Sequence, residues 1–209
     1  MNIIQLLESK VGGRWTGVSF HKDGVPEGAC PARSMRFCEA VKESSTGPLV
    51  LTPEFIDCPG ALRSLGWGTD LNEMASLNAE RTGVTVDTAR EIIADVPHLD
   101  GTVKAITIGD NEFSDIVLSY VQPETTMKVI RRWEQVDGRS LTTKVAGTMA
   151  VCGSVAVAAY LTGQVCLSFG CPDSRFYGHL GRDQLVIGMP VAIAEDLFLK
   201  ERNAQHAYV

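Results

Sequence analysis

The sequence predicts a single α/β domain spanning residues 1–209, in which a mixed, partly parallel sheet is flanked by helices. The chain has 209 residues, of which 44% are hydrophobic, and this is enough to bury one full core. Short apolar runs alternate with amphipathic stretches along most of the chain, as they do in α/β proteins. Residues 115–145 have the order strand, helix, strand, which is typical of a right-handed crossover between parallel strands.

Apolar runs of four to seven residues mark the strands, which we expect at 15–20, 48–52, 103–108, 115–121, 141–145, 164–169 and 184–188. Apolar residues at helical spacing mark the helices, which we expect at 2–10, 34–44, 61–67, 70–81, 85–96, 123–136, 145–161 and 190–200. Thr85 or Asp87 suits the N-cap of one helix, and Pro123 suits the first turn of another. The polar tail 201–209 is expected to fray.

Composition limits the classes of function. The chain has 19 basic and 25 acidic residues, and the net charge of −6 argues against a protein that coats nucleic acid or an anionic membrane. The first residues, MNIIQLLESK, have no basic leader followed by a long apolar run, so we expect a cytoplasmic protein. Six cysteines in such a chain indicate reduced thiols or metal ligands rather than a disulfide framework.

The stretch 147–175 is where chemistry is most expected, because it holds half of the cysteines in a largely apolar segment. Residues 145–161 carry no charge and many small side chains, which favours a buried helix. Seventeen residues are few for crossing a bilayer, and Thr148 and Ser154 also favour a core helix. Residues 170–175 form a predicted turn at the end of a strand, and ligands in α/β proteins collect at such ends.

Common catalytic motifs are missing from the sequence. It contains no GxxxxGK[ST], strand-following GxGxxG, HExxH or GxSxG, so the usual nucleotide-binding, zinc-protease and serine-hydrolase signatures are absent. The four histidines are scattered without the spacing of a ligand pair. The cysteines are therefore the main candidates for chemistry.

Proline follows three of the cysteines, Cys30, Cys58 and Cys171. Proline fixes its own φ and restrains the residue before it, so each of these thiols is expected at a rigid corner of the backbone. Ferredoxin-type iron–sulfur sequences also place proline after a ligand cysteine, but their ligands are closely spaced, and this chain has no CxxC. The alternative is that the cysteines are small buried apolar residues.

Four patches of sequence resemble the DUF169 family: RFCEAV around Cys38, CPGALRSLG around Cys58, the isolated Cys152, and GCPDSR around Cys171. The resemblance covers most of the chain. Members of that family are mostly uncharacterised prokaryotic proteins, common in anaerobes, whose recurring cysteines resemble a metal or iron–sulfur ligand set. One departure is Ala61, where the family pattern suggests a second glycine after the cysteine.

The resemblance implies a ligand set of Cys58, Cys152 and Cys171, with Cys38 as a fourth metal ligand or a nearby thiol. Four thiolates from separate segments meet only in a folded core, and their charge needs a compensating cation. Both tetrahedral zinc and a [4Fe–4S] cluster accept four cysteines. We expect the cluster, because a chain of this length gains less from a structural zinc clamp.

The residues expected to act in catalysis are Cys38 and Arg175. A thiol beside an open iron can bind or protonate a substrate, and an arginine after Cys171 can bind an anionic substrate or offset cluster charge, its alternative being a surface salt bridge. The expected partner is a small molecule or a redox protein, with neither nucleic acid nor membrane, and the chain is a candidate homo-oligomer. The competing functions are a zinc-binding structural protein and a cofactor-free interaction module with buried thiols.

Overall fold

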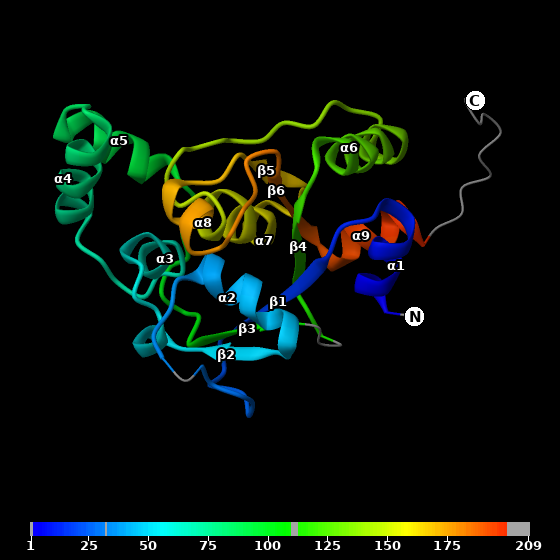
Figure 1. Cartoon of the computed structure of the whole chain (residues 1–209), viewed down its shortest axis with the longest axis horizontal. Coiled ribbons are helices and arrows are strands. Elements are labelled where there is room, and N and C mark those ends of the chain that lie inside the picture. Colours follow the sequence, from blue (N-terminus) through cyan, green and yellow to red (C-terminus); the bar gives the residue numbers. More distant parts are fainter. Residues whose placement is uncertain (1, 32, 110–112, 200–209) are drawn as a thin grey trace.

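The computed structural model describes residues 2–31, 33–109 and 113–199. Its described residues form one α/β domain around a six-stranded sheet with the order β2-β3-β1-β4-β6-β5 (Figure 1). The strands are β1 (Trp15–His21), β2 (Leu49–Leu51), β3 (Ala105–Gly109), β4 (Ile116–Val121), β5 (Cys166–Ser168) and β6 (Leu185–Pro190). The helices are α1 (Ile3–Val11), α2 (Phe37–Glu43), α3 (Pro59–Ser64), α4 (Leu71–Thr82), α5 (Val86–Asp95), α6 (Pro123–Asp137), α7 (Ala158–Thr162), α8 (Pro172–Phe176) and α9 (Val191–Phe198). A π-helical segment, Cys152–Val157, runs directly into α7.

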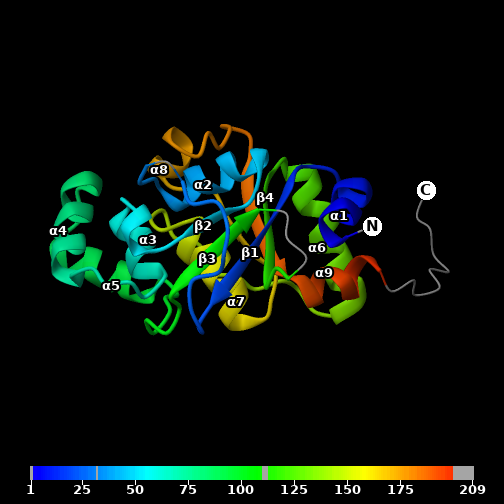
Figure 2. The same cartoon turned by 90° about the horizontal axis from the view of Figure 1, so that it is seen from below.

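Both faces of the sheet are covered. Alternate residues of β4 enter two separate hydrophobic clusters, Ile116 and Leu118 on one face and Val117 and Val121 on the other. The second face packs against α1, α6 and α9, and the first packs against the remaining helices. Figures 1 and 2 place α4 and α5 at the end of the molecule opposite α1, α6 and α9. No helix in the described part of the chain is long and apolar enough to cross a membrane.

The expected partly parallel sheet is wrong, because every pairing between the named strands is antiparallel. The apolar run of β4 reflects burial on both faces, which an antiparallel sheet also has when helices cover both sides. The predicted crossover fails because 141–145 is not a strand, and the chain passes from α6 to the π-helix without regular structure. The strand beside β4 is instead β6, which runs antiparallel to it.

The expected helix at 145–161 begins later than predicted, at Cys152. The backbone of Met149 has φ of 48°, a left-handed conformation that ends any right-handed helix. At the other end of the chain, α9 ends at Phe198, and the predicted extension to Lys200 and the tail 201–209 lie outside the described residues.

Candidate functional site

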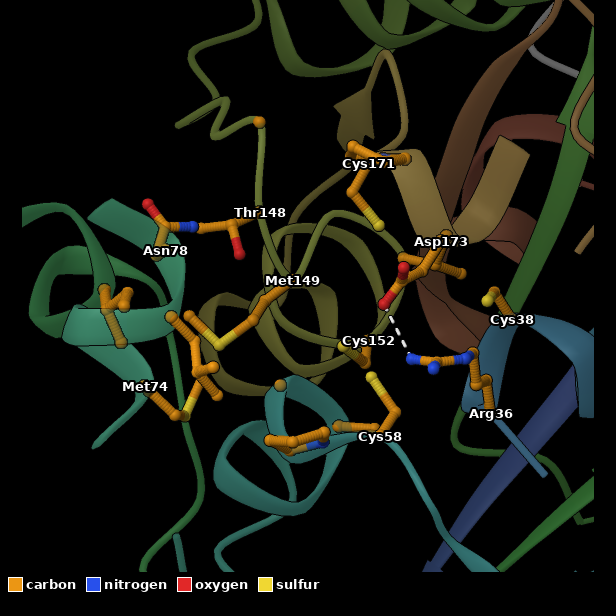
Figure 3. A pocket seen from close by; sticks show the side chains of 18 of the residues that line it. Arg36, Cys38, Cys58, Met74, Asn78, Thr148, Met149, Cys152, Cys171 and Asp173 are labelled. Carbon is orange, nitrogen blue, oxygen red and sulfur yellow. Dashed lines mark hydrogen bonds and ion pairs between the residues drawn. The ribbon is translucent and has the colours of Figure 1, made fainter. Parts of the chain in front are cut away.

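A cavity of about 200 Å³ lies on the first face of the sheet, between α2, α3, α4, α8 and the segment that leads into the π-helix. Figure 3 shows its lining from close by. All four cysteines of the predicted set, Cys38, Cys58, Cys152 and Cys171, line this cavity. The fold therefore brings together four thiols that are separated by up to 133 residues in the sequence (171 − 38).

Each of these thiols stands at the start of a helical segment. Cys58 and Cys171 are the N-cap residues of α3 and α8, and the prolines that follow them occupy the first helical position. Cys152 is the first residue of the π-helix, and Cys38 is the second residue of α2. π-Helical segments are often found at functional sites. Local helix starts thus place the four thiols around one cavity.

The other two cysteines lie elsewhere. Cys166 is buried in β5, where its sulfur is 3.9 Å from the Thr162 hydroxyl oxygen, and Cys30 is exposed. Neither lines the cavity. They therefore serve as internal controls for any chemistry assigned to the other four.

Burial dominates the electrostatics of the cavity thiols. Burial raises the pKa of Cys38 to about 12, and the thiols of Cys171 and Cys58 add to the rise. Burial also raises the pKa of Cys152 well above its usual value, the Cys58 thiol adds to this, and the Ser64 hydroxyl, 3.6 Å from the Cys152 sulfur, opposes it. Without a bound cation the thiols of Cys38 and Cys152 are protonated at neutral pH.

The cavity also contains a cation, Arg36, whose ion pair the sequence did not indicate. Arg36 Nη1 is 2.7 Å from Asp173 Oδ2 (Figure 3). The guanidinium lies over the ring of Tyr177, at 4.2 Å from its centroid. Arg36 Nε is buried and has no hydrogen-bond partner among the described residues. Because the positive charge of Arg36 faces the thiol of Cys58, it opposes the burial-driven rise of the Cys58 pKa.

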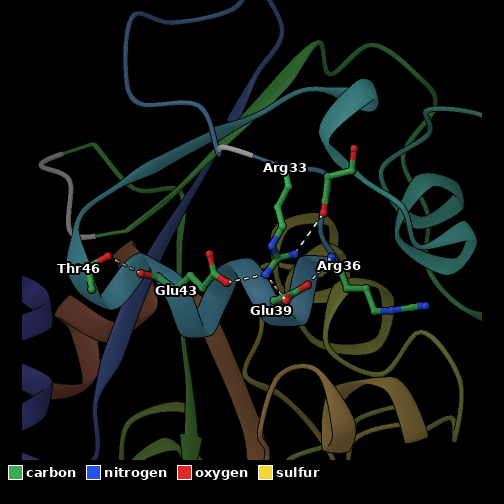
Figure 4. A network of polar contacts seen from close by, with 6 residues as sticks. Arg33, Arg36, Glu39, Glu43 and Thr46 are labelled. Atoms are coloured by element: carbon green, nitrogen blue, oxygen red, sulfur yellow. Dashed lines mark hydrogen bonds and ion pairs between the residues drawn. The ribbon is translucent and has the colours of Figure 1, made fainter.

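The start of α2 is held by a polar network beside this cation (Figure 4). Glu39 accepts a hydrogen bond from the backbone N–H of Arg36 and another, at 2.6 Å, from the Arg33 guanidinium. Burial alone would raise the pKa of Glu39, but these two bonds and the arginine charges lower it overall. The first turn of α2, which carries Cys38, is therefore fixed from outside the cavity.

Arg175 lies outside the cavity lining. Its guanidinium donates hydrogen bonds to the carbonyl oxygens of Phe169, at 2.6 Å, and of Gly181. These contacts hold the chain on either side of α8, so the guanidinium is already engaged by backbone. Ala61, the departure from the family pattern, is buried in α3 and donates its backbone N–H to the carbonyl of Cys58 at 3.0 Å.

Met149 is a second lining residue that the sequence did not indicate. Its left-handed backbone is unusual for a residue with a side chain and carries an energetic cost that the surrounding structure must offset. Its side chain lies against α3, where a Cβ on Gly60 would stand 2.8 Å from Met149 Cγ. Only glycine at position 60 leaves room for this side chain beside the thiols.

The donor set suits a soft metal centre, since thiolates are the ligands of iron–sulfur clusters and of structural zinc. As the side chains stand, however, no group of three or more His, Cys, Asp and Glu residues within 2–31, 33–109 and 113–199 is arranged to hold a metal ion. The thiols border a cavity instead of converging on one point. Binding of any metal would need rotation of the cysteine side chains.

Searches of curated proteins and of solved structures returned no match. A family model does match, over residues 11–198, and its description is DUF169, Uncharacterised ArCR. The match includes all four cavity cysteines and the three arginines discussed above. The chain therefore belongs to the DUF169 family.

Proposed function

We propose that this chain binds a [4Fe–4S] cluster through Cys58, Cys152 and Cys171, with Cys38 as the fourth ligand or as a thiol beside the cluster. One observation carries the proposal: the four cysteines of the family-like patches line one cavity, and the two remaining cysteines do not. A set of buried and partly buried thiols from four separate helix starts is more than a hydrophobic core needs, since any small apolar residue would fill such positions.

One positive charge of the chain, on Arg36, would offset part of the negative charge of a thiolate-bound cluster. Buried thiolates are unfavourable unless positive charge compensates them, and Arg36 is the cation that faces Cys58. We assign the charge-offsetting role to Arg36 in place of Arg175, because the Arg175 guanidinium is bonded to carbonyl oxygens outside the cavity. The buried, unpartnered Nε of Arg36 leaves one donor for a bound acceptor.

The shape of the cavity favours a cluster over zinc. Four thiolates on one zinc ion must all stand about 2.3 Å from the same point, which the described cysteines do not approach. In a cluster each iron takes its own thiolate, so the sulfurs surround a larger body. A cavity of about 200 Å³ suits a guest larger than a single ion.

A cluster with three protein thiolates offers an open iron as a Lewis acid for a small molecule, and one with four thiolates carries electrons to a redox partner. Cys38 decides between these cases. It stands in the first turn of α2, fixed by Glu39, where its thiol is able to bind or protonate a substrate.

Anaerobic purification tests the proposal. Protein made without oxygen is expected to be brown and to contain iron and acid-labile sulfide. Cys58→Ser or Cys171→Ser is expected to lose the iron, while Cys166→Ser, which changes a cysteine outside the cavity, keeps it. Stoichiometric zinc from iron-replete, anaerobic cells would favour the structural-zinc alternative, and metal-free protein would favour an interaction module. Equal iron loss in all three variants would reject the ligand assignment.

A second experiment assigns Cys38. If three cysteines hold the cluster, Cys38→Ser retains iron, and the electron paramagnetic resonance spectrum of the reduced, unaltered protein changes when cyanide or a small thiol is added. If Cys38 is the fourth ligand, its variant loses iron and the spectrum ignores both additions. The second result would replace the open-site enzyme by an electron carrier.

A further inference from the structure

The cavity has a second end whose chemistry differs from that of the thiols. Met74, from α4, and Met149 separate the four cysteines from Asn78 and Thr148 (Figure 3). Leu77 and Arg81, one helical turn apart on α4, complete this outer end. Its walls are thus thioether and aliphatic side chains, and its polar groups are an amide, a hydroxyl and a guanidinium.

The outer end carries an uncompensated positive charge. The charged side chains of the lining are Arg36, Arg81 and Asp173, and the first of these is paired with the last. Arg81 is exposed and makes no hydrogen bond or ion pair with any residue that the structure describes. An exposed arginine is ordinary on a protein surface, but this one borders an apolar cavity and has spare hydrogen-bond donors beside it.

Those neighbouring donors are also unused within the described chain. The Asn78 side-chain amide and the Thr148 hydroxyl have no hydrogen-bond partner there, whereas the hydroxyl of Thr82, one turn further along α4, donates to the carbonyl of Asn78 at 2.7 Å. A guanidinium, an amide N–H and a hydroxyl are together the groups that recognise a carboxylate.

We propose that the outer end binds the carboxylate of a small organic monoanion through Arg81, Asn78 and Thr148. The apolar part of that anion lies between Leu77 and the two methionines, whose flexible thioethers adapt to different shapes, and points toward the cysteines. A dry apolar cavity of about 150 Å³ is enough for benzene. The whole cavity, of about 200 Å³, therefore has room for a ring of this size when no cluster fills its sulfur end.

The residues that define this anion site are separate from the proposed cluster ligands, so its existence does not require a cluster. The two would act together in one respect. Four thiolates around a cluster repel an anion, and Arg81 attracts it, so the acid is oriented with its uncharged end toward the sulfur end of the cavity. The reacting part of a substrate would then be that uncharged end.

Calorimetric titration with phenylacetate tests the anion site, and phenylacetamide serves as the neutral analogue. Phenylacetate is expected to bind the unaltered protein and to bind Arg81→Gln at least tenfold more weakly. Leu77→Glu places a like charge at the same mouth, on a side chain that is already 43% exposed, and is expected to weaken phenylacetate binding as well. Phenylacetamide is expected to bind all of these proteins with the same low affinity.

Arg131→Gln is the matched control, since Arg131 is an exposed arginine of α6, outside the cavity lining. It removes the same charge and is expected to leave phenylacetate affinity unchanged. Three results would each overturn the proposal. Arg81→Gln could bind phenylacetate as tightly as the unaltered protein does, or Arg131→Gln could weaken binding as much as Arg81→Gln does. The third result is that the unaltered protein does not bind phenylacetate.

Each titration is carried out on anaerobically purified protein of measured iron content and on metal-free, thiol-reduced protein. If the anaerobic protein contains iron but neither form binds phenylacetate, the anion site is rejected and the cluster proposal stands. Phenylacetate binding to a protein that never contains iron rejects the cluster and leaves the anion site standing. The two proposals therefore fail by different measurements.

Discussion

Replacing Asp173 by asparagine tests whether the ion pair with Arg36 holds the cavity together. The pair joins α8, which follows Cys171, to the start of α2, which carries Cys38. Asp173→Asn keeps the size of the side chain but removes its charge. The Arg36 guanidinium then remains between the thiols and Tyr177 without a counterion.

The expected loss follows from how far the pair is buried. The side chains of Arg36 and Asp173 are 17% and 26% exposed. A fully exposed pair contributes less than about 1 kcal/mol, and removing one partner of a fully buried pair costs about 3–5 kcal/mol. We therefore expect Asp173→Asn to lower the free energy of unfolding by about 2 kcal/mol.

Urea unfolding of metal-free, thiol-reduced protein, followed by tryptophan fluorescence, measures this loss without any contribution from a metal. Asp173 also lies in the first turn of α8, where a negative charge is favourable, so the single variant mixes two effects. A double-mutant cycle with Arg36→Met isolates the pair.

The control for this cycle is Asp95→Asn, which breaks a pair with Lys144 whose side chains are 67% and 70% exposed. That change is expected to have no resolvable effect, because exposed pairs contribute little and are screened by salt. If the Arg36–Asp173 coupling is no larger than that of the exposed pair, the half-buried pair does not stabilise this end of the cavity, and the reasoning fails.

Two further predictions concern the same region. Burial raises the pKa of Cys38 to about 12 from an ordinary 9.0. The unfolding free energy of the metal-free protein is therefore unaffected by this thiol below pH 9, and it falls as the pH rises from 9 toward 12, because only the unfolded chain then ionises the thiol. The loss is about 1.4 kcal/mol at pH 10, and it should appear as a steeper decline of unfolding free energy than in Cys38→Ala; parallel declines would contradict it. Gly153→Ala should destabilise the protein by about 1–3 kcal/mol in urea unfolding, because its Cβ would stand 2.5 Å from Val96 Cγ1 and 2.9 Å from Ser64 Oγ. Gly147→Ala, whose Cβ meets nothing within 4 Å, is the control, and an equal effect of both changes would show that the contacts at position 153 are not the cause.

Local patterns in the sequence predict burial well and strand direction poorly. The apolar run of β4 correctly indicates a strand that is buried on both faces. Direction depends on which strand lies beside it, and the partner β6 begins 64 residues after the end of β4 (185 − 121). The segment 141–145 alternates like a strand, yet it has no place in the sheet, because β6 already occupies the edge of β4 that it would need.

In the cavity, too, features that depend on neighbouring residues are predictable from the sequence, and contacts between distant residues are not. Cysteine–proline pairs predict rigid corners, and the structure makes Cys58 and Cys171 the caps of short helices. The sequence places Arg36 two residues before Cys38, but it does not indicate the ion pair of Arg36, because the partner Asp173 is 137 residues away. Nor does it indicate a role for Arg81, since a charged residue on an amphipathic helix reads as a solvated face until the fold places it against a cavity.

The prolines after Cys58 and Cys171 also determine which backbone N–H groups lie near these two thiols. A proline at the first helical position has no N–H, so the donors at such a helix start begin one residue later. At Cys58 the N–H groups of Gly60 and Ala61 interact with the thiol and, together with Arg36, oppose the burial-driven rise of its pKa. At Cys152 the Ser64 hydroxyl opposes the burial-driven rise of the pKa, and the neighbouring thiols of Cys58, Cys171 and Cys38 add to it. Of these two buried thiols, Cys58 is thus the one that deprotonates more readily, and a metal that enters the cavity is expected to meet a thiolate there first.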